Sequence, residues 1–189
     1  MNPATWQLSP EPFTSARGNR SCSITDKQGQ RISFELGTCD EPVFSPFGAQ
    51  CWQDNPSSRK SLEVDATPRV CATIKAIETV LKQQLVANSQ KIFGKVLALD
   101  KIDELWHSPL QQKNVDYPPR VRLKVSPNTS LWDGVTKTAL PPDTDLRGAS
   151  LVAKVSPAGV WLMSKEAGLT MLCQHLLVYP AASASCPWG

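Results

Sequence analysis

Apolar residues in the last third of the chain fall into three runs, which cover residues 149–155, 160–163 and 169–179. The first two runs are separated by Ser156-Pro157-Ala158-Gly159, where proline presets the second position of a tight turn and glycine can close it. A mostly polar stretch that ends at Gly168 separates the second run from the third. This pattern predicts a three-stranded antiparallel meander.

The third run is long for a strand. At about 3.3 Å per residue it would span roughly 36 Å, so we expect a strand that bends around a small barrel. A helix is the competing interpretation, but Thr170, Val178 and Tyr179, with glycine before the run and proline after it, favour the strand.

Residues 120–126 show the cleanest alternation in the chain. The apolar positions are Val121, Leu123 and Val125, and the cationic positions are Arg120, Arg122 and Lys124. A strand places alternate side chains on opposite faces, so the three cations are predicted to share one face at intervals of about 6.6 Å.

The first half of the chain predicts shorter strands and loops. Residues 21–25 and 31–36 flank Asp26-Lys27-Gln28-Gly29-Gln30 and indicate a hairpin, and residues 61–66 indicate another short strand. Residues 1–20, rich in proline and serine, are predicted to form an extended arm. Residues 39–59 hold three prolines and are predicted to form an irregular loop.

Two helices are expected. Thr67 and Pro68 suit the N-cap and the first helical position, and an apolar stripe follows, ending before Asn88. The stripe consists of Val70, Ile74, Ile77, Leu81 and Leu85, and is more typical of a core-facing helix than of a partner site. A short helix is expected from Asp100 to Trp106.

Composition narrows the class of protein. The chain has 189 residues, enough for a single domain, with 41% hydrophobic and 20% charged residues. It lacks an apolar run that could span a membrane and begins without a signal-peptide pattern, so we expect no membrane association and an intracellular location. Six cysteines without a C-x-x-C pair, and only two histidines, indicate reduced thiols rather than a metal site.

The motifs of common enzyme classes are missing. The sequence contains no P-loop, dinucleotide fingerprint, zincin motif or nucleophile elbow, so we expect no enzyme and no cofactor. Cys173 with His175 could be imagined as a nucleophile and its base, but nothing else in the sequence supports that pair. His107 is explained by its place at a helix end.

Charge is more informative in its distribution than in its total. The net charge is +3, and residues 111–165 carry eight basic but only four acidic side chains. A basic strand face beside Lys154 and Trp161 fits single-stranded nucleic acid, because cations track phosphates and an aromatic ring can stack on a base. The alternative is that the cations form an ordinary solvated face and Trp161 belongs to the core.

Five segments together resemble a known family. They are SPFG at 45–48, NSQKIFGK at 88–95, YPPRVRLKV at 117–125, GASLVAKVSPAGVWL at 148–162 and GLTMLCQHLLVY at 168–179. In order and spacing they resemble the single-stranded-DNA-binding proteins of large nucleocytoplasmic DNA viruses and protists, which are similar to phage single-stranded-DNA-binding proteins.

The resemblance implies a mainly β fold: an OB-like antiparallel barrel over residues 21–180, decorated by one long and one short helix, with a tail at 181–189. It also implies binding of single-stranded DNA, or RNA, without sequence preference. The candidate binding residues are Arg120, Arg122, Lys124, Lys154, Trp161, Trp132 and Lys165. The chain departs from the phage pattern in having no acidic residue after Glu166, so tail-mediated recruitment of partners is not expected.

A different class of function stays open. The chain could be a non-catalytic subunit of a larger assembly that docks protein partners through residues 1–20, 39–59 and 181–189, or a homo-oligomer. If the basic face binds nucleic acid, replacing Arg120, Arg122 and Lys124 together by alanine should weaken binding at low salt and leave the thermal midpoint nearly unchanged.

Overall fold

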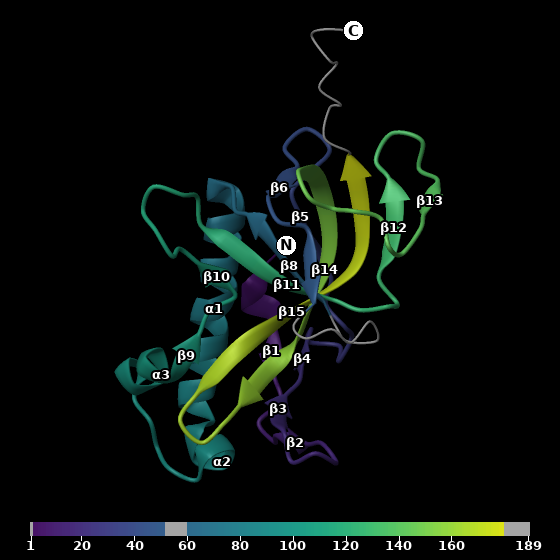
Figure 1. The fold of residues 1–189 in the computed structure, drawn as a ribbon. Coiled ribbons are helices and arrows are strands. Elements are labelled where there is room, and N and C mark those ends of the chain that lie inside the picture. Colours follow the sequence, from purple (N-terminus) through teal and green to yellow (C-terminus); the bar gives the residue numbers. More distant parts are fainter. Residues whose placement is uncertain (1, 52–59, 180–189) are drawn as a thin grey trace, which may run out of the picture.

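A computed structural model describes residues 2–51 and 60–179 of the chain (Figure 1). The helices are η1 (Pro3–Thr5), α1 (Pro68–Ala87), α2 (Ser89–Phe93) and α3 (Leu99–Leu105). The strands are β1 (Gln7–Leu8), β2 (Phe13–Thr14), β3 (Arg20–Cys22), β4 (Ile24–Thr25), β5 (Phe34–Leu36), β6 (Val43–Ser45), β7 (Ala49–Cys51), β8 (Lys60–Asp65), β9 (Trp106–His107), β10 (Leu110–Gln111), β11 (Arg120–Val125), β12 (Ser130–Asp133), β13 (Ala139–Leu140), β14 (Ala149–Leu162) and β15 (Ala167–Tyr179).

The fold is organised around β14 and β15, the two longest strands, which pair antiparallel along their whole length. Figure 1 shows them running through the molecule from the β12–β13 side to the side where α2 and α3 lie. Strands β3, β5 and β6 pair with the far edge of β14, and β9, β11 and β12 pair with β15. The third apolar run is therefore a strand, as predicted.

The predicted turn at residues 156–159 is wrong, since β14 passes straight through it. The pairing register shifts between Pro157 and Gly159 and again between Lys154 and Val155, so irregularities in one strand replace the turn. On the edge of β14 away from β15, β5 pairs with residues 153–155 and β3 pairs with residues 160–162. Neither strand pairs with Pro157, so the proline, which has no backbone N–H to donate, is tolerated there. Gly159 allows close approach: a Cβ there would lie 2.7 Å from the carbonyl oxygen of Cys22.

The mainly β class is confirmed, but the closed antiparallel barrel is not. The main path runs β2-β3-β14-β15-β11-β8-β7, and among the described strands its two ends, β2 and β7, are not paired with each other. Three strands, β9, β11 and β12, lie parallel to β15. The prediction of two helices also missed α2, which ends at Gly94 in the left-handed conformation.

Helix α1 begins and ends as the sequence predicts. Thr67 Oγ1 accepts a hydrogen bond from the Val70 amide at 3.3 Å, and Asn88 forms the C-cap. The whole predicted apolar stripe is buried in the same core as the inner face of the sheet. No helix in the described ranges is long and apolar enough to cross a membrane.

The N-terminal residues join the core. Trp6 and Leu8 are buried, and the side-chain amide of Gln84 on α1 bonds the Trp6 carbonyl and the Leu8 amide. Residues 26–30 form the predicted turn, but β4 pairs with β1 and β5 with β14, so the predicted hairpin between residues 21–25 and 31–36 does not form. The division into arm, domain and tail stays a prediction, and residues 181–189 lie outside the described residues.

Candidate nucleic-acid interface

Strand β11 divides its side chains as the alternation predicts. Val121, Leu123 and Val125 are buried in the core that α1 also lines, and the three cations face the other way. Strand β8 pairs with β11 in antiparallel register and adds acidic groups to that outer face.

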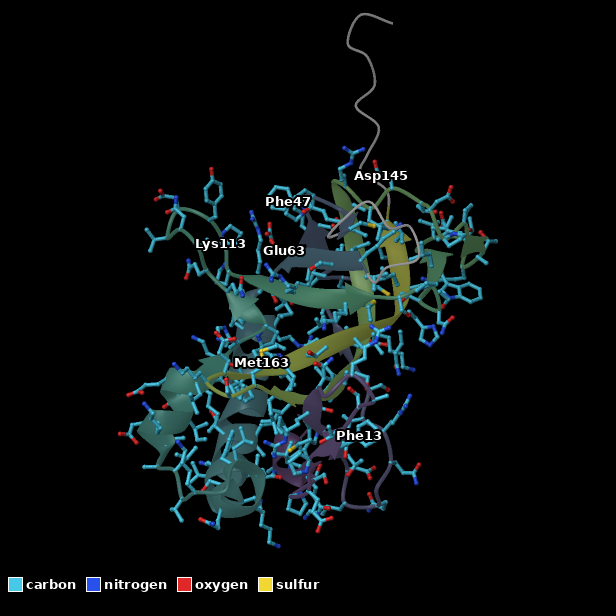
Figure 2. All side chains as sticks on the ribbon, turned by 60° about the horizontal axis from the view of Figure 1, so that its bottom comes forward. Phe13, Phe47, Glu63, Lys113, Asp145 and Met163 are labelled. Atoms are coloured by element: carbon cyan, nitrogen blue, oxygen red, sulfur yellow. The ribbon has the colours of Figure 1, made fainter. Side chains whose placement is uncertain are left out.

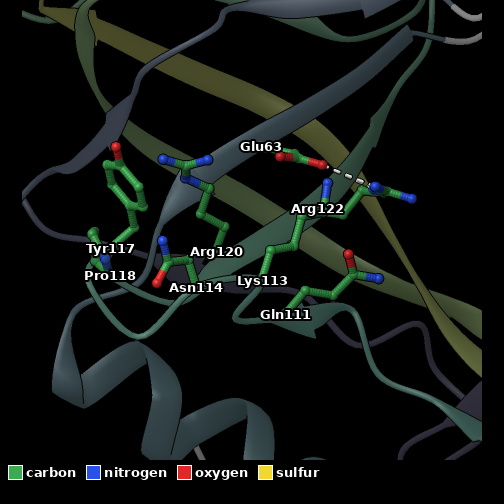
Figure 3. A pocket seen from close by; sticks show the side chains of 8 residues that line it. All are labelled: Glu63, Gln111, Lys113, Asn114, Tyr117, Pro118, Arg120 and Arg122. Carbon is green, nitrogen blue, oxygen red and sulfur yellow. Dashed lines mark hydrogen bonds and ion pairs between the residues drawn. The ribbon is translucent and has the colours of Figure 1, made fainter.

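These acidic groups form ion pairs with the arginines. Arg120 Nε lies 2.9 Å from Asp65 Oδ1, and Arg122 Nη2 lies 2.9 Å from Glu63 Oε1. Lys124 stands opposite Ser61 instead. Figure 3 shows the Arg122–Glu63 pair at the edge of the hollow that Arg120 and Tyr117 line. The two arginines of β11 therefore form ion pairs with β8.

Four hollows over this face share lining residues with one another. The first is lined by Tyr117, Arg120 and Arg122 among others, the second by Phe47, Lys113 and Arg122, the third by His107, Arg122, Lys124 and Trp161, and the fourth by Arg20, Lys124 and Trp161. The third and fourth measure about 320 and about 350 Å³. We call this surface the groove.

The groove brings together four of the predicted site residues: Arg120, Arg122, Lys124 and Trp161. Figure 2 shows Phe47, Glu63 and Lys113, which line one of its hollows, at one side of the sheet, with Met163 of the fourth hollow apart from them. One end of the groove therefore lies over β6, β7 and β8, and the other end lies beside the turn between β14 and β15.

Trp161 lies across the sheet surface. Its partner in the β14–β15 ladder is Gly168, and a Cβ on that glycine would come within 2.5 Å of the indole ring. The ring thus covers the bare glycine and stays partly exposed where it lines the groove. An indole that packs over a sheet and stays partly exposed can act as a stacking surface for a base.

His107 is a site residue that the sequence did not reveal. Strand β9 pairs parallel with β15 and sets the imidazole beside Trp161, with ring centroids 5.6 Å apart and planes tilted by 31°. Its Nε2 lies 3.5 Å from Glu166 Oε1. The sequence signal pointed to a helix end, and only the long-range pairing of β9 brings the ring here.

Phe47, Tyr117 and Lys113 were also missed as groove residues. The Arg120 guanidinium lies 4.7 Å from the centroid of the Phe47 ring and 5.9 Å from that of Tyr117. Phe47 and Tyr117 lie in two of the segments that carry the family resemblance, SPFG and YPPRVRLKV, but neither was named there as a binding residue, and Lys113 lies outside both segments. No local pattern places such residues, because their position depends on the strands that the loops connect.

Three predicted site residues do not line the groove. Lys154 stands opposite Glu35 of β5 and His175 of β15. Trp132 of β12 donates from its indole nitrogen to Ser130 Oγ, which in turn bonds His175 Nδ1. Lys165 is exposed in the turn between β14 and β15. Their roles in binding stay predictions.

The imagined cysteine–histidine pair lacks the geometry of a nucleophile and its base. Burial raises the pKa of the Cys173 thiol to about 12, so the thiol is protonated at neutral pH. Its Sγ faces the His175 carbonyl oxygen at 3.6 Å, while the His175 ring bonds Ser130. Among the residues that the structure describes, no group of three or more histidine, cysteine or acidic side chains could hold a metal ion.

Comparison with known proteins adds a likeness of fold. No family model and no curated protein matches the chain. Among solved structures, the chain is similar to gp2.5, a single-stranded-DNA-binding protein encoded by bacteriophage T7, with a TM-score of 0.57 and 12% identity over 83% of this chain and 96% of that one. A single-stranded-DNA-binding protein from bacteriophage Enc34 matches with a TM-score of 0.47 and 10% identity over 94% of each chain.

These neighbours bear on the resemblance noted from the sequence. The fold is that of a phage single-stranded-DNA-binding protein, T7 gp2.5. The resemblance to proteins of large DNA viruses and protists gains no support from the comparisons and stays a prediction.

Proposed function

We propose that this protein binds single-stranded DNA without sequence preference, through the groove over the outer face of β11, β15 and β14. The observation that carries the proposal is that Trp161 of β14 lines the same hollow as Arg122 and Lys124 of β11, although the two strands are distant in sequence. Cations for phosphates and a ring for bases are the two components that such binding requires.

The roles of the groove residues follow from their positions. Lys124 lines two of the hollows together with Trp161. Arg20 enters from β3, where its Nη2 also donates to the Ile92 carbonyl at 2.7 Å. Both are suited to phosphates, and the indole of Trp161 between them is suited to a base.

Single strands are favoured over duplex by the same geometry. A base can stack on Trp161 only if its own face is free, and the bases of a duplex are stacked on one another. The gp2.5 protein, which shares the fold, is named as a single-stranded-DNA-binding protein, and this supports the proposal.

Two variants test the proposal: Lys124→Ala and Trp161→Ala, with Lys75→Ala as the matched control. Lys75 is an exposed lysine on α1, and its loss changes the net charge as Lys124→Ala does. Lys124→Ala should make the slope of log affinity against log salt concentration less steep by about 0.7, which is the contribution of one phosphate contact to a single strand. Trp161→Ala should weaken binding about 5- to 150-fold, as expected for the loss of about 1–3 kcal/mol of stacking.

The measurement is fluorescence anisotropy of labelled oligo-dT at several salt concentrations. If both variants bind as the wild type does while the protein stays folded, the groove is not the binding site. If Lys75→Ala weakens binding as much as Lys124→Ala, the effect is one of net charge alone.

A further inference from the structure

The end of the groove away from Trp161 carries a second group of rings. Phe47 and Tyr117 both contact the Arg120 guanidinium, and Arg120 is also held by Asp65. Figure 3 shows Tyr117 and Arg120 side by side over the hollow. Arg120 lies about 13 Å along β11 from Lys124, since Lys124 is four positions further along the strand.

Packing alone does not explain these rings. Phe47 keeps 43% of its surface exposed and Tyr117 keeps 60%, although aromatic residues of the core here, such as Trp6, are almost completely buried. A ring that served only to bury apolar surface would gain little from such positions.

Both rings contact the Arg120 guanidinium, and the backbone beside each ring is restrained. Gly48, next to Phe47, has a φ of +66°, and a Cβ there would meet Arg147 at 2.8 Å. The Tyr117 amide bonds the Asn114 carbonyl, and Gln112 Nε2 donates to the Tyr117 carbonyl at 3.1 Å. Rings ordered before binding lose less conformational entropy when a ligand arrives.

We propose that Phe47 and Tyr117 form a second base-binding station, which takes bases from the same single strand that passes over Trp161. The inference rests on the proposed function and extends its site. Arg120 orders the two rings, and Lys113, which lines the neighbouring hollows, faces the phosphates. Arg122 lies between the two stations, because it lines the hollows on both sides.

Because the two stations lie apart, we expect affinity to depend on the length of the oligonucleotide. A short strand occupies one station, and a longer strand occupies both. The affinity of the wild type should therefore rise from oligo-dT of about 4 nucleotides to oligo-dT of about 16, the range of site sizes for one domain of this kind. Loss of the second station should remove most of this gain.

The experiment compares Phe47→Ala/Tyr117→Ala with the wild type, using fluorescence anisotropy with both lengths. Val115→Ala is the matched control, because Val115 is an 88% exposed apolar residue of the same loop as Tyr117. We expect the double variant to bind the longer strand at least about 10-fold more weakly, which corresponds to about 1.4 kcal/mol. Tyr117→Phe, which keeps the ring, should bind as the wild type does.

The salt dependence of binding distinguishes rings that stack on bases from rings that only position Arg120. If the rings stack on bases, the slope of affinity against salt for the double variant should match the wild type. A slope reduced by about 0.7 would mean that the rings only hold Arg120 against a phosphate, which would overturn the proposal. Unchanged affinity for the longer strand would overturn it too, and a wild type that binds neither strand would remove the proposed function as well.

Discussion

The indole of Trp161 occupies a position that only a glycine opposite it permits. Any side chain at Gly168 would meet the ring at 2.5 Å and the His107 carbonyl oxygen at 2.7 Å. The proposed stacking surface thus depends on a pair of residues on facing strands, one that supplies the ring and one that supplies the space beneath it.

Gly168→Ala should therefore weaken DNA binding although it alters no residue proposed to contact DNA. We expect Gly168→Ala to bind about as weakly as Trp161→Ala. Combining the two substitutions should cause little further loss, because one displaces the ring and the other removes it. The thermal midpoint should fall as well, since the new methyl group also meets backbone. Fluorescence anisotropy with the two single variants and the double variant, measured well below their thermal midpoints, completes a double-mutant cycle. Fully additive losses would contradict this account of Trp161.

Cysteine reactivity provides a residue-scale test of the fold. Burial raises the pKa of Cys22 to about 11 and that of Cys173 to about 12, whereas the thiols of Cys39 and Cys51 are exposed. At pH 8 a thiol reagent should modify Cys39 and Cys51 in the native protein, and Cys22 and Cys173 only after denaturation. Mass spectrometry of digested protein reads out each site. Native modification of Cys22 or Cys173 would contradict the placement of β3 or β15.

At the scale of elements, β8 sets the charge of β11. The two strands place Asp65 and Glu63 beside Arg120 and Arg122, so a phosphate that binds either arginine competes with a carboxylate already there. We infer that the acidic residues of β8 hold the affinity of the groove below what its cations alone would give.

Removing one of these carboxylates should strengthen binding. Glu63→Gln and Asp65→Asn should each raise the affinity for oligo-dT and steepen its salt dependence by up to about 0.7, since an arginine becomes available for a phosphate. Glu41→Gln is the control, because it removes one exposed negative charge from the segment between β5 and β6, and Glu41 lines none of the hollows of the groove. A loss of affinity in the β8 variants would mean that the acids position the arginines for binding.

The ion pairs also revise an expectation drawn from the sequence. Replacing Arg120, Arg122 and Lys124 together would leave Asp65 and Glu63, whose side chains are only 23% and 21% exposed, without these arginines. Partly exposed pairs contribute about 0.2–1 kcal/mol each, so the thermal midpoint of the triple variant should fall by a few degrees. Differential scanning calorimetry would detect the change, and an unchanged midpoint would indicate that the pairs add nothing to stability.

Elements differ in how far the sequence predicts them. Helix α1 is specified locally by Thr67, Pro68 and the apolar stripe, so its limits were predicted correctly. The outer face of β11 follows from strict alternation and was also predicted. The strand through Pro157 was not predicted, because β3 and β5, which pair with β14 on either side of the proline, are remote from it in the sequence. Phe47, His107 and Tyr117 join the site only through such remote pairings.

At the scale of the whole molecule, the two faces of the sheet have separate tasks. One face packs with the apolar stripe of α1 in the core, and the other carries the groove. The net charge of +3 is small, and among the described residues five lysines and arginines line the groove: Arg20, Lys113, Arg120, Arg122 and Lys124. Binding should therefore depend on salt to a moderate degree that these residues set.

The most direct test of single-strand binding is fluorescence anisotropy of labelled oligo-dT with the wild-type protein over a range of salt concentrations, with duplex DNA of equal length as competitor. Three phosphate contacts predict a slope of about −2 for log affinity against log salt, and five predict about −3.5. We expect a slope between these values, and a duplex that fails to displace the single strand. No binding at low salt, or equal competition by duplex, would contradict the account.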